Sequence, residues 1–191
     1  YECTLGGTDT GDTGPAAVAG LFYPGNQVEL ARDILGMLEQ SRDASLAPGF
    51  PKALIVPHAG YIYSGQVAAH AFALLRPAAG IVKRVVLLGP VHRVPVRGLA
   101  LPGVEAFETP LGPVAVDTGL VARLAALPQI TTSRAAHAQE HSLEVQLPFL
   151  QQALDQFTAD NISSFDEALA IVFRILFLFF AESRRLVPVD H

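Results

Sequence analysis

The sequence is short of cysteine and of charge, and it contains no tryptophan. Its single cysteine, Cys3, cannot form a disulfide within the chain, which argues against a disulfide-stabilised secreted protein. The opening residues carry no basic-then-apolar leader, so we expect a cytoplasmic location. Only 16% of the residues are charged whereas 50% are hydrophobic, and this balance excludes an intrinsically disordered chain.

Positive charge and long apolar runs are also lacking. The formal net charge is -5 at pH 7, so no electrostatic attraction to nucleic acid or to an anionic membrane is expected. The longest apolar run covers residues 168–181 and is interrupted by Arg174, which makes it shorter than the roughly 20 residues that span a bilayer. We therefore predict neither a nucleic-acid partner nor a membrane partner.

The composition along the chain predicts three parts. Residues 1–14 are rich in glycine, threonine and aspartate without periodicity, and we expect a disordered tail there. Residues 15–155 combine short apolar runs with amphipathic segments, as one folded domain does. In residues 156–191, Ser164 and Glu167 form a capping box, and the helix predicted after them is apolar on every side. We interpret this segment as a hydrophobic helical tail foreign to the domain, with 168–181 as a surface for a protein partner or for self-association.

Helical periodicity and short apolar runs together predict an α/β fold. Helices are predicted at residues 28–41, 66–75, 118–127 and 140–154, the last one bent near Pro148. Buried strands are predicted at 53–56 and 84–88, and shorter strands at 99–101, 105–109 and 114–116. The order strand, helix, strand between residues 53 and 88 is typical of a βαβ unit, which indicates a mostly parallel sheet with flanking helices.

Two histidines directly follow the two predicted buried strands. His58 comes after strand 53–56, and His92 comes after strand 84–88. The carboxyl ends of parallel strands meet at the sheet edge where ligands bind, so the two imidazoles are expected to lie close together. Imidazole binds iron, zinc and copper, and two such groups could face one ion. The alternative is that each is a hydrogen-bonded structural histidine, and the spacing alone leaves both interpretations open.

A third histidine and a neighbouring carboxylate belong to the same hypothesis. His141 lies beside Glu140, whose side chain could orient an imidazole or act as a base. Two histidines plus one further ligand, with open positions left over, is the arrangement of a catalytic iron or zinc centre. His137 lies four residues before His141 and would share a helix face with it, which is also a ligand spacing. For His70, within the helix predicted at 66–75, we expect no functional role.

Five sequence blocks in a fixed order carry a resemblance to a known family. The blocks are residues 15–24 (PAAVAGLFYP), 57–65 (PHAGYIYSG), 89–92 (GPVH), 107–112 (FETPLG) and 140–150 (EHSLEVQLPFL). In order and spacing they resemble the Memo-like family, also called AmmeMemoRadiSam system protein B, across about residues 15–154. Five ordered blocks are far more specific than one short motif.

The resemblance implies a fold and a set of site residues. Members of the family are similar in fold to class III extradiol dioxygenases, which use a non-haem iron. By this resemblance His58 and His92 are metal ligands and His141 lies in the same pocket, so these three are the candidate ligands. The implied metal is iron or copper, completed in the family by a cysteine from the C-terminal third. We take Glu140 and His141 as candidate catalytic residues, acting on a small-molecule substrate that the resemblance does not identify.

The sequence departs from the family pattern after about Leu154. We expect a sheet that is incomplete at its C-terminal side and a site without its cysteine, because Cys3 lies at the opposite end of the chain. The tail resembles instead a helical segment of type II restriction–modification methyltransferases. Three hypotheses stay open: a metal-binding, dioxygenase-like oxidoreductase with an incomplete site, a non-catalytic binding or interaction module, and an inactive fragment of a fused or rearranged gene.

Overall fold

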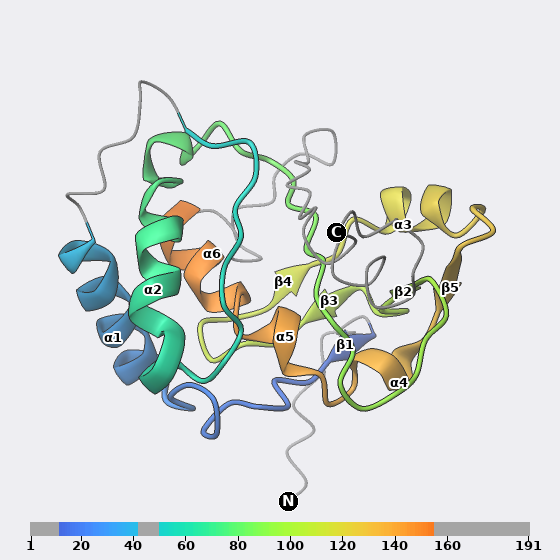
Figure 1. Cartoon of the computed structure of the whole chain (residues 1–191), viewed down its shortest axis with the longest axis horizontal. Coiled ribbons are helices and arrows are strands. Elements are labelled where there is room, and N and C mark those ends of the chain that lie inside the picture. The colour runs from blue at the N-terminus through green and yellow to red at the C-terminus, as the bar shows by residue number, and fades with distance from the viewer. Residues whose placement is uncertain (1–11, 42–49, 155–191) are drawn as a thin grey trace, which may run out of the picture.

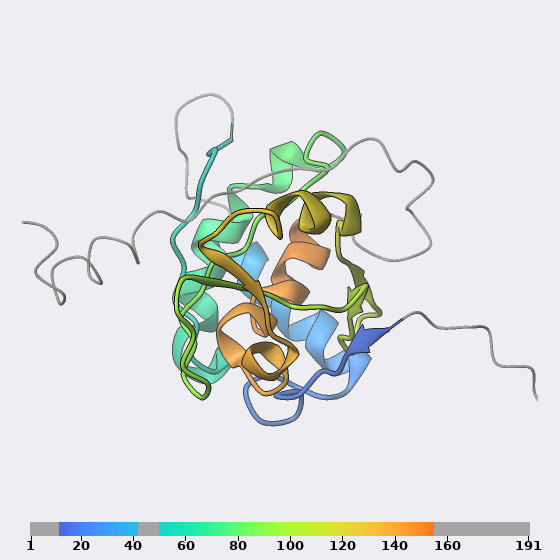
Figure 2. The same cartoon turned by 90° about the vertical axis from the view of Figure 1, so that its right-hand side faces the viewer.

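The computed structural model describes residues 12–41 and 50–154, and Figure 1 shows their arrangement. Three longer helices, α1, α2 and α6, lie together on one side of the molecule, and the strands lie on the other. Figure 2 views the molecule from the strand side, with the strands and short helices in front of the longer helices. Residues 1–11, which include Cys3, and residues 156–191, which include segment 168–181, lie outside the described residues, so the predictions for them stay predictions.

The core of the molecule is built by the three longer helices: α1 spans Gln27–Gln40, α2 spans Tyr61–Ala73 and α6 spans Leu147–Leu154. On α1, Leu30, Ile34 and Leu38 recur every fourth residue and are fully buried, as an amphipathic helix requires. Phe72 of α2 stacks on Phe149 of α6 with their ring centroids 5.2 Å apart. The predicted helix 28–41 is therefore confirmed, and α2 begins five residues before the predicted start at 66.

Two small sheets form the other side of the molecule. The first has the order β1-β3-β4, in which β1 (Thr13–Gly14) pairs parallel with β3 (Ala106–Phe107), and β3 pairs antiparallel with β4 (Val114–Ala115). The second pairs β2 (Leu99–Leu101) parallel with β5 (Ile130–Thr132), a strand that was not predicted. The combination of helices with small parallel and mixed sheets fits the predicted α/β class. Residues 13 and 14 belong to a strand, although they fall in the segment predicted as a tail.

The two predicted buried strands are extended but unpaired. Between the described residues, the backbone groups of segments 53–56 and 84–88 form no ladder, so the predicted mostly parallel sheet is absent from this part of the chain. Leu54 is buried whereas the next residue, Ile55, is 61% exposed, as alternation along an extended segment requires. An apolar run indicates that side chains are buried, but a strand also needs a neighbour for its backbone, and the run does not specify one.

The remaining helices are short. They are η1 (Arg76–Ala78), α3 (Thr118–Leu124), α4 (Arg134–His137) and α5 (His141–Glu144). The helix predicted at 140–154 is divided into α5 and α6, because Pro148 has no N–H to donate to the carbonyl group four residues earlier. Pro148 is accommodated in the first turn of α6, where no such donor is needed. None of the helices in the described ranges is long and apolar enough to cross a membrane.

Candidate metal centre

Three histidines from three separate segments meet at one place. His58 lies in the loop before α2, His92 follows the extended segment 84–88, and His141 is the first residue of α5. Each offers one ring nitrogen, and these three atoms lie within 4.8 Å of one another. The ring centroids are 5.3 Å apart for His58 and His92, 5.7 Å for His58 and His141, and 4.6 Å for His92 and His141. The structure thus brings together the three residues that the sequence singled out as candidate ligands.

The carboxylate of Glu140 accepts hydrogen bonds from both the backbone and the ring of His92. The backbone N–H of His92 donates to Oε2 of Glu140 at 2.6 Å, and Nδ1 of the ring lies 2.8 Å from Oε1. Oε1 also accepts from the backbone N–H of Ser142 at 3.0 Å. Burial by itself would raise the pKa of Glu140, but the hydrogen bonds from His92 and Ser142 lower it to about 2.

The charge on Glu140 selects the tautomer of His92. An ionised carboxylate only accepts hydrogen bonds, so Nδ1 of His92 carries the proton and donates it to Oε1. Nε2 is then the nitrogen with a free lone pair. Nδ1 of His141 lies 3.4 Å from the same carboxylate oxygen, which places Glu140 beside two of the three imidazoles. This is the arrangement in which a carboxylate orients a metal-binding histidine.

The other two imidazoles favour the neutral form. Burial lowers the pKa of His58, repulsion from His92 lowers it further, and the carboxylate of Glu140 opposes both effects. Burial also lowers the pKa of His141, and the carboxylate of Glu140 raises it. Repulsion from three neighbouring groups lowers it further: His92, His58 and Arg93. Only a neutral imidazole has a lone pair for a metal ion, so these shifts keep His58 and His141 competent as ligands down to a more acidic pH.

One wall of the site comes from residues that the sequence did not single out. The ring of Phe22 lies 4.5 Å from that of His141, centroid to centroid, and its carbonyl oxygen accepts the backbone N–H of Tyr61 at 2.7 Å. A side chain at Gly60 would come within 3.3 Å of the Phe22 carbonyl oxygen, so glycine permits this close approach. Phe22 and Gly60 lie in the sequence blocks 15–24 and 57–65 that carry the family resemblance, and this was the one feature of the sequence that could have pointed to them.

Comparison with known proteins gives the family. The sequence model of the family described as "Memo-like protein" matches residues 14–160. A MEMO1 family protein of Aquifex aeolicus is 41% identical over 138 residues, which cover 71% of this chain and 48% of the relative. The chain belongs to the Memo family. One from Ignicoccus hospitalis is 40% identical (72% and 50% covered), and the memo-1 homolog of Caenorhabditis elegans is 38% identical (74% and 39% covered). The chain thus spans about half the length of the curated relatives it matches.

Other residues considered from the sequence lie outside the cluster of three histidines in this Memo chain. Nε2 of His137 lies 3.0 Å from the carbonyl oxygen of Ala100, and His137 belongs to α4 rather than to the helix of His141, so the two do not share a helix face. His70 is exposed on α2, and its Nδ1 lies 2.7 Å from the carbonyl oxygen of Gln66.

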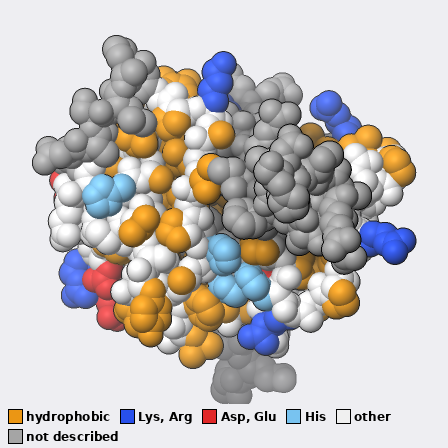
Figure 3. Space-filling model, viewed as in Figure 1, with side chains coloured by type: hydrophobic (Ala, Val, Ile, Leu, Met, Phe, Trp, Pro, Cys, Tyr) orange, Lys and Arg blue, Asp and Glu red, His pale blue; other side chains and the backbone are white. Residues whose placement is uncertain are grey.

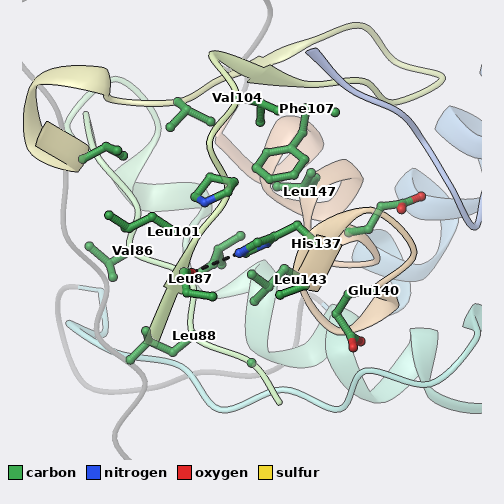
Figure 4. A pocket seen from close by; sticks show the side chains of 18 of the residues that line it. Val86, Leu87, Leu88, Leu101, Val104, Phe107, His137, Glu140, Leu143 and Leu147 are labelled. Atoms are coloured by element: carbon green, nitrogen blue, oxygen red, sulfur yellow. Dashed lines mark hydrogen bonds between the residues drawn. The ribbon is translucent and has the colours of Figure 1, made fainter. Parts of the chain in front are cut away.

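An apolar cavity of about 460 Å³ in this Memo chain is lined by Glu140, Ser142 and His137 but by none of the three candidate ligands. Figure 4 shows its lining, in which Val86, Leu87 and Leu88 face Leu143, Leu147 and Phe107. His137 projects among these side chains, whereas the carboxylate of Glu140 points away from them. Figure 3 shows histidine side chains gathered on one face and bordered by hydrophobic side chains. His92 is the most exposed of the three site histidines, so a ligand can reach the site from solvent.

Proposed function

We propose that this Memo-family chain binds one metal ion through His58, His92 and His141. The observation that carries the proposal is the convergence of three imidazole nitrogens within 4.8 Å, together with the carboxylate of Glu140 on the far side of His92. Nitrogen-metal bonds are about 2.0–2.1 Å long, so donors this far apart can surround a single ion after small side-chain rotations.

The donor set suits iron or copper. Imidazole is a ligand of intermediate softness that binds both metals, and an all-oxygen set suited to magnesium or calcium is not what the described residues offer here. Three protein ligands leave coordination positions for a small molecule. Bound there, an iron or copper ion would supply Lewis-acid or redox chemistry to a small-molecule substrate.

We assign separate roles to the protein residues around the metal. His58 and His141 contribute lone pairs that remain unprotonated because their pKa values are lowered. Glu140 orients His92 and is a weak base, because three hydrogen bonds hold its pKa at about 2. His141, the other candidate catalytic residue, would accept a proton only when its lone pair is not bound to the metal, because a neutral imidazole has one such lone pair. Relationship to the class III extradiol dioxygenases, and with it an oxidoreductase activity, is part of this proposal.

The test is metal uptake under anaerobic conditions. Ferrous iron or cuprous copper is added to the purified full chain, the excess is removed, and bound metal is assayed against protein. We expect about one equivalent per chain in the wild type and none in a His58→Ala, His92→Ala double variant. His70→Ala is the matched control, since it removes an exposed imidazole distant from the site and should leave uptake unchanged. Uptake that survives the double substitution would exclude this site.

A further inference from the structure

A buried carboxylate outside the metal site receives three hydrogen bonds from one segment. Glu144, the last residue of α5, is 6% exposed. Its Oε2 accepts the backbone N–H of Ala17 at 3.0 Å, and its Oε1 accepts the backbone N–H of Val18 at 3.0 Å and the hydroxyl of Tyr23 at 2.6 Å. All three donors belong to residues 15–23, which we call the N-terminal strap. The strap is thus attached to the helix that begins with His141.

The strap is folded back on itself between these attachments. The N–H groups of Leu21 and Phe22 both donate to the carbonyl oxygen of Val18, and Gly20 has a positive φ of 79° that few other residues adopt. This turn presents Phe22 toward the metal site. Because Glu144 holds residues on both sides of the turn, the position of Phe22 depends on that carboxylate.

Phe22 in turn touches two of the three histidine-bearing segments. Its ring packs on the imidazole of His141 with the centroids 4.5 Å apart. Its carbonyl oxygen accepts the N–H of Tyr61, three residues after His58. His141 and Glu144 lie one helical turn apart on α5, so the carboxylate that holds the strap of Phe22 is close to the histidine that Phe22 contacts.

We propose that Glu144 is a positioning residue of the metal centre, acting through the N-terminal strap to fix the ring of His141 and the loop of His58. The inference rests on the proposed metal-binding function. An ionised carboxylate buried in an apolar setting is unfavourable, and an apolar side chain would pack α5 against the core without that cost. A carboxylate is suited instead to gathering three donors, because it accepts through both oxygens and donates nothing. Burial raises the pKa of Glu144, and the hydrogen bonds from Tyr23, Val18 and Ala17 oppose that rise.

The test compares Glu144→Gln with Thr109→Val in the full chain. Glutamine keeps the size of the side chain but replaces one acceptor oxygen with an NH₂ group that faces a donor. Thr109 is also 6% exposed and hydrogen-bonded through its hydroxyl group, but to Gly112 and Gln151 instead of the strap. Its substitution therefore matches the loss of a buried polar contact and leaves the strap attached.

Two readouts are used, and the first needs no metal. The imidazole NMR signals of metal-free protein report the ring-current shift that Phe22 imposes on His141, with His141→Gln used to assign the signal. We expect Glu144→Gln to lose this shift and to weaken ferrous iron binding about tenfold, the lower end of what loss of a ligand-orienting partner costs. Tyr23→Phe, which keeps the carboxylate but removes one donor, should give a smaller change in the same direction. Thr109→Val should leave both readouts as in the wild type.

The outcomes separate this inference from the proposed function. If the wild type retains no iron, the proposed function fails, and the NMR shift alone still decides the role of Glu144. A His141 signal that is unchanged in Glu144→Gln overturns the inference. An equal loss in Thr109→Val overturns it too, because the effect would then be a general loosening of the fold. Should Glu144→Gln not fold, an unchanged His141 signal in Tyr23→Phe is the overturning result.

Discussion

Replacing Glu140 by glutamine should weaken both the fold and the proposed metal site. In the wild type, Oε2 of Glu140 accepts one hydrogen bond and Oε1 accepts two, all from His92 and Ser142. Glutamine has a single acceptor oxygen, so its NH₂ group must face at least one of these donors. With the oxygen in the place of Oε1 the NH₂ group faces the backbone N–H of His92, and in the other orientation it faces the His92 ring and Ser142, so one of the two contacts that position His92 is lost either way.

The magnitude follows from the pKa of the carboxyl group. The pKa falls from 4.5 to about 2 on folding, and each pKa unit corresponds to about 1.4 kcal/mol, so the folded state favours the ionised carboxylate by about 3 kcal/mol. The carboxylate is buried, but the His92 ring that it contacts is 40% exposed, so solvent screening makes this value an upper limit. Because the pKa is lowered on folding, the contribution is complete above pH 4.5 and is lost as the pH falls through about 2.

The assay is denaturant unfolding of metal-free protein at several pH values. We expect Glu140→Gln to lower the free energy of unfolding by up to about 3 kcal/mol at pH 7 and the difference from wild type to vanish near pH 2. Metal affinity should fall about 10- to 100-fold in parallel. Glu105→Gln, at an exposed carboxylate, is the control and should change stability by less than about 0.5 kcal/mol. Equal stability of Glu140→Gln and wild type at pH 7 would refute the reasoning.

Two further predictions concern pH and backbone geometry. The pKa values of His58 and His141 are lowered on folding, so the unfolded chain binds more protons than the folded chain below pH 6.5. The free energy of unfolding of metal-free protein should therefore fall as the pH decreases through that value. A His58→Gln, His141→Gln double variant should flatten this pH dependence, and an unchanged pH dependence would contradict the assignment. Gly98→Ala should destabilise by roughly 3 kcal/mol, because φ is +83° and a Cβ would clash with the carbonyl oxygen of Gln129. Gly119→Ala, in α3 and free of such a clash, should be neutral or stabilising in the same thermal unfolding experiment.

Helix α1 was predictable from the sequence because it has its own local pattern, whereas α4 was not predicted. Leu30, Ile34 and Leu38 mark the buried face of α1, and the side chain of Asn26 accepts the N–H groups of Val28 and Glu29 at its start. The start of α2 was missed because its first turn is fixed from outside the helix, by the hydrogen bond from the Tyr61 N–H to the strap. No periodicity within α2 could indicate that contact.

The sheets were less predictable because strand pairing is not local. Strand 99–101 was predicted, but its partner 130–132 lies about thirty residues away and carries two polar threonines, which hid it from a search for apolar runs. Conversely, segments 53–56 and 84–88 have strong apolar runs and no backbone partner between the described residues. Of the residues in these two segments only Leu54 is buried, so the apolar runs predicted neither full burial nor a pairing partner, and both depend on information from elsewhere in the chain.

The site histidines lie close together as predicted, but the predicted cause, a shared sheet edge, is not what the structure shows. We expected His58 and His92 to meet because parallel strands would end at one sheet edge, yet the segments before them are unpaired between the described residues. Their imidazoles are nevertheless 5.3 Å apart, centroid to centroid. Something other than a β-ladder must therefore hold the two loops in the described part of the chain.

Segment 140–146 supplies that restraint. Four of its side chains form hydrogen bonds to the segments around the site. Glu140 accepts from His92, and Ser142 donates to the Pro90 carbonyl oxygen of the same loop at 2.8 Å. Glu144 accepts from the N-terminal strap, and Gln146 donates to the Pro57 carbonyl oxygen beside His58 at 3.1 Å. These four are half of the buried polar side chains in the described ranges, concentrated in seven consecutive residues. Buried polar groups that are fully hydrogen-bonded specify one arrangement of the chain more strictly than apolar contacts do. The segment that carries one candidate ligand, His141, thus also contacts the loops of the other two, and these contacts bring the three histidines together without a continuous sheet beneath them.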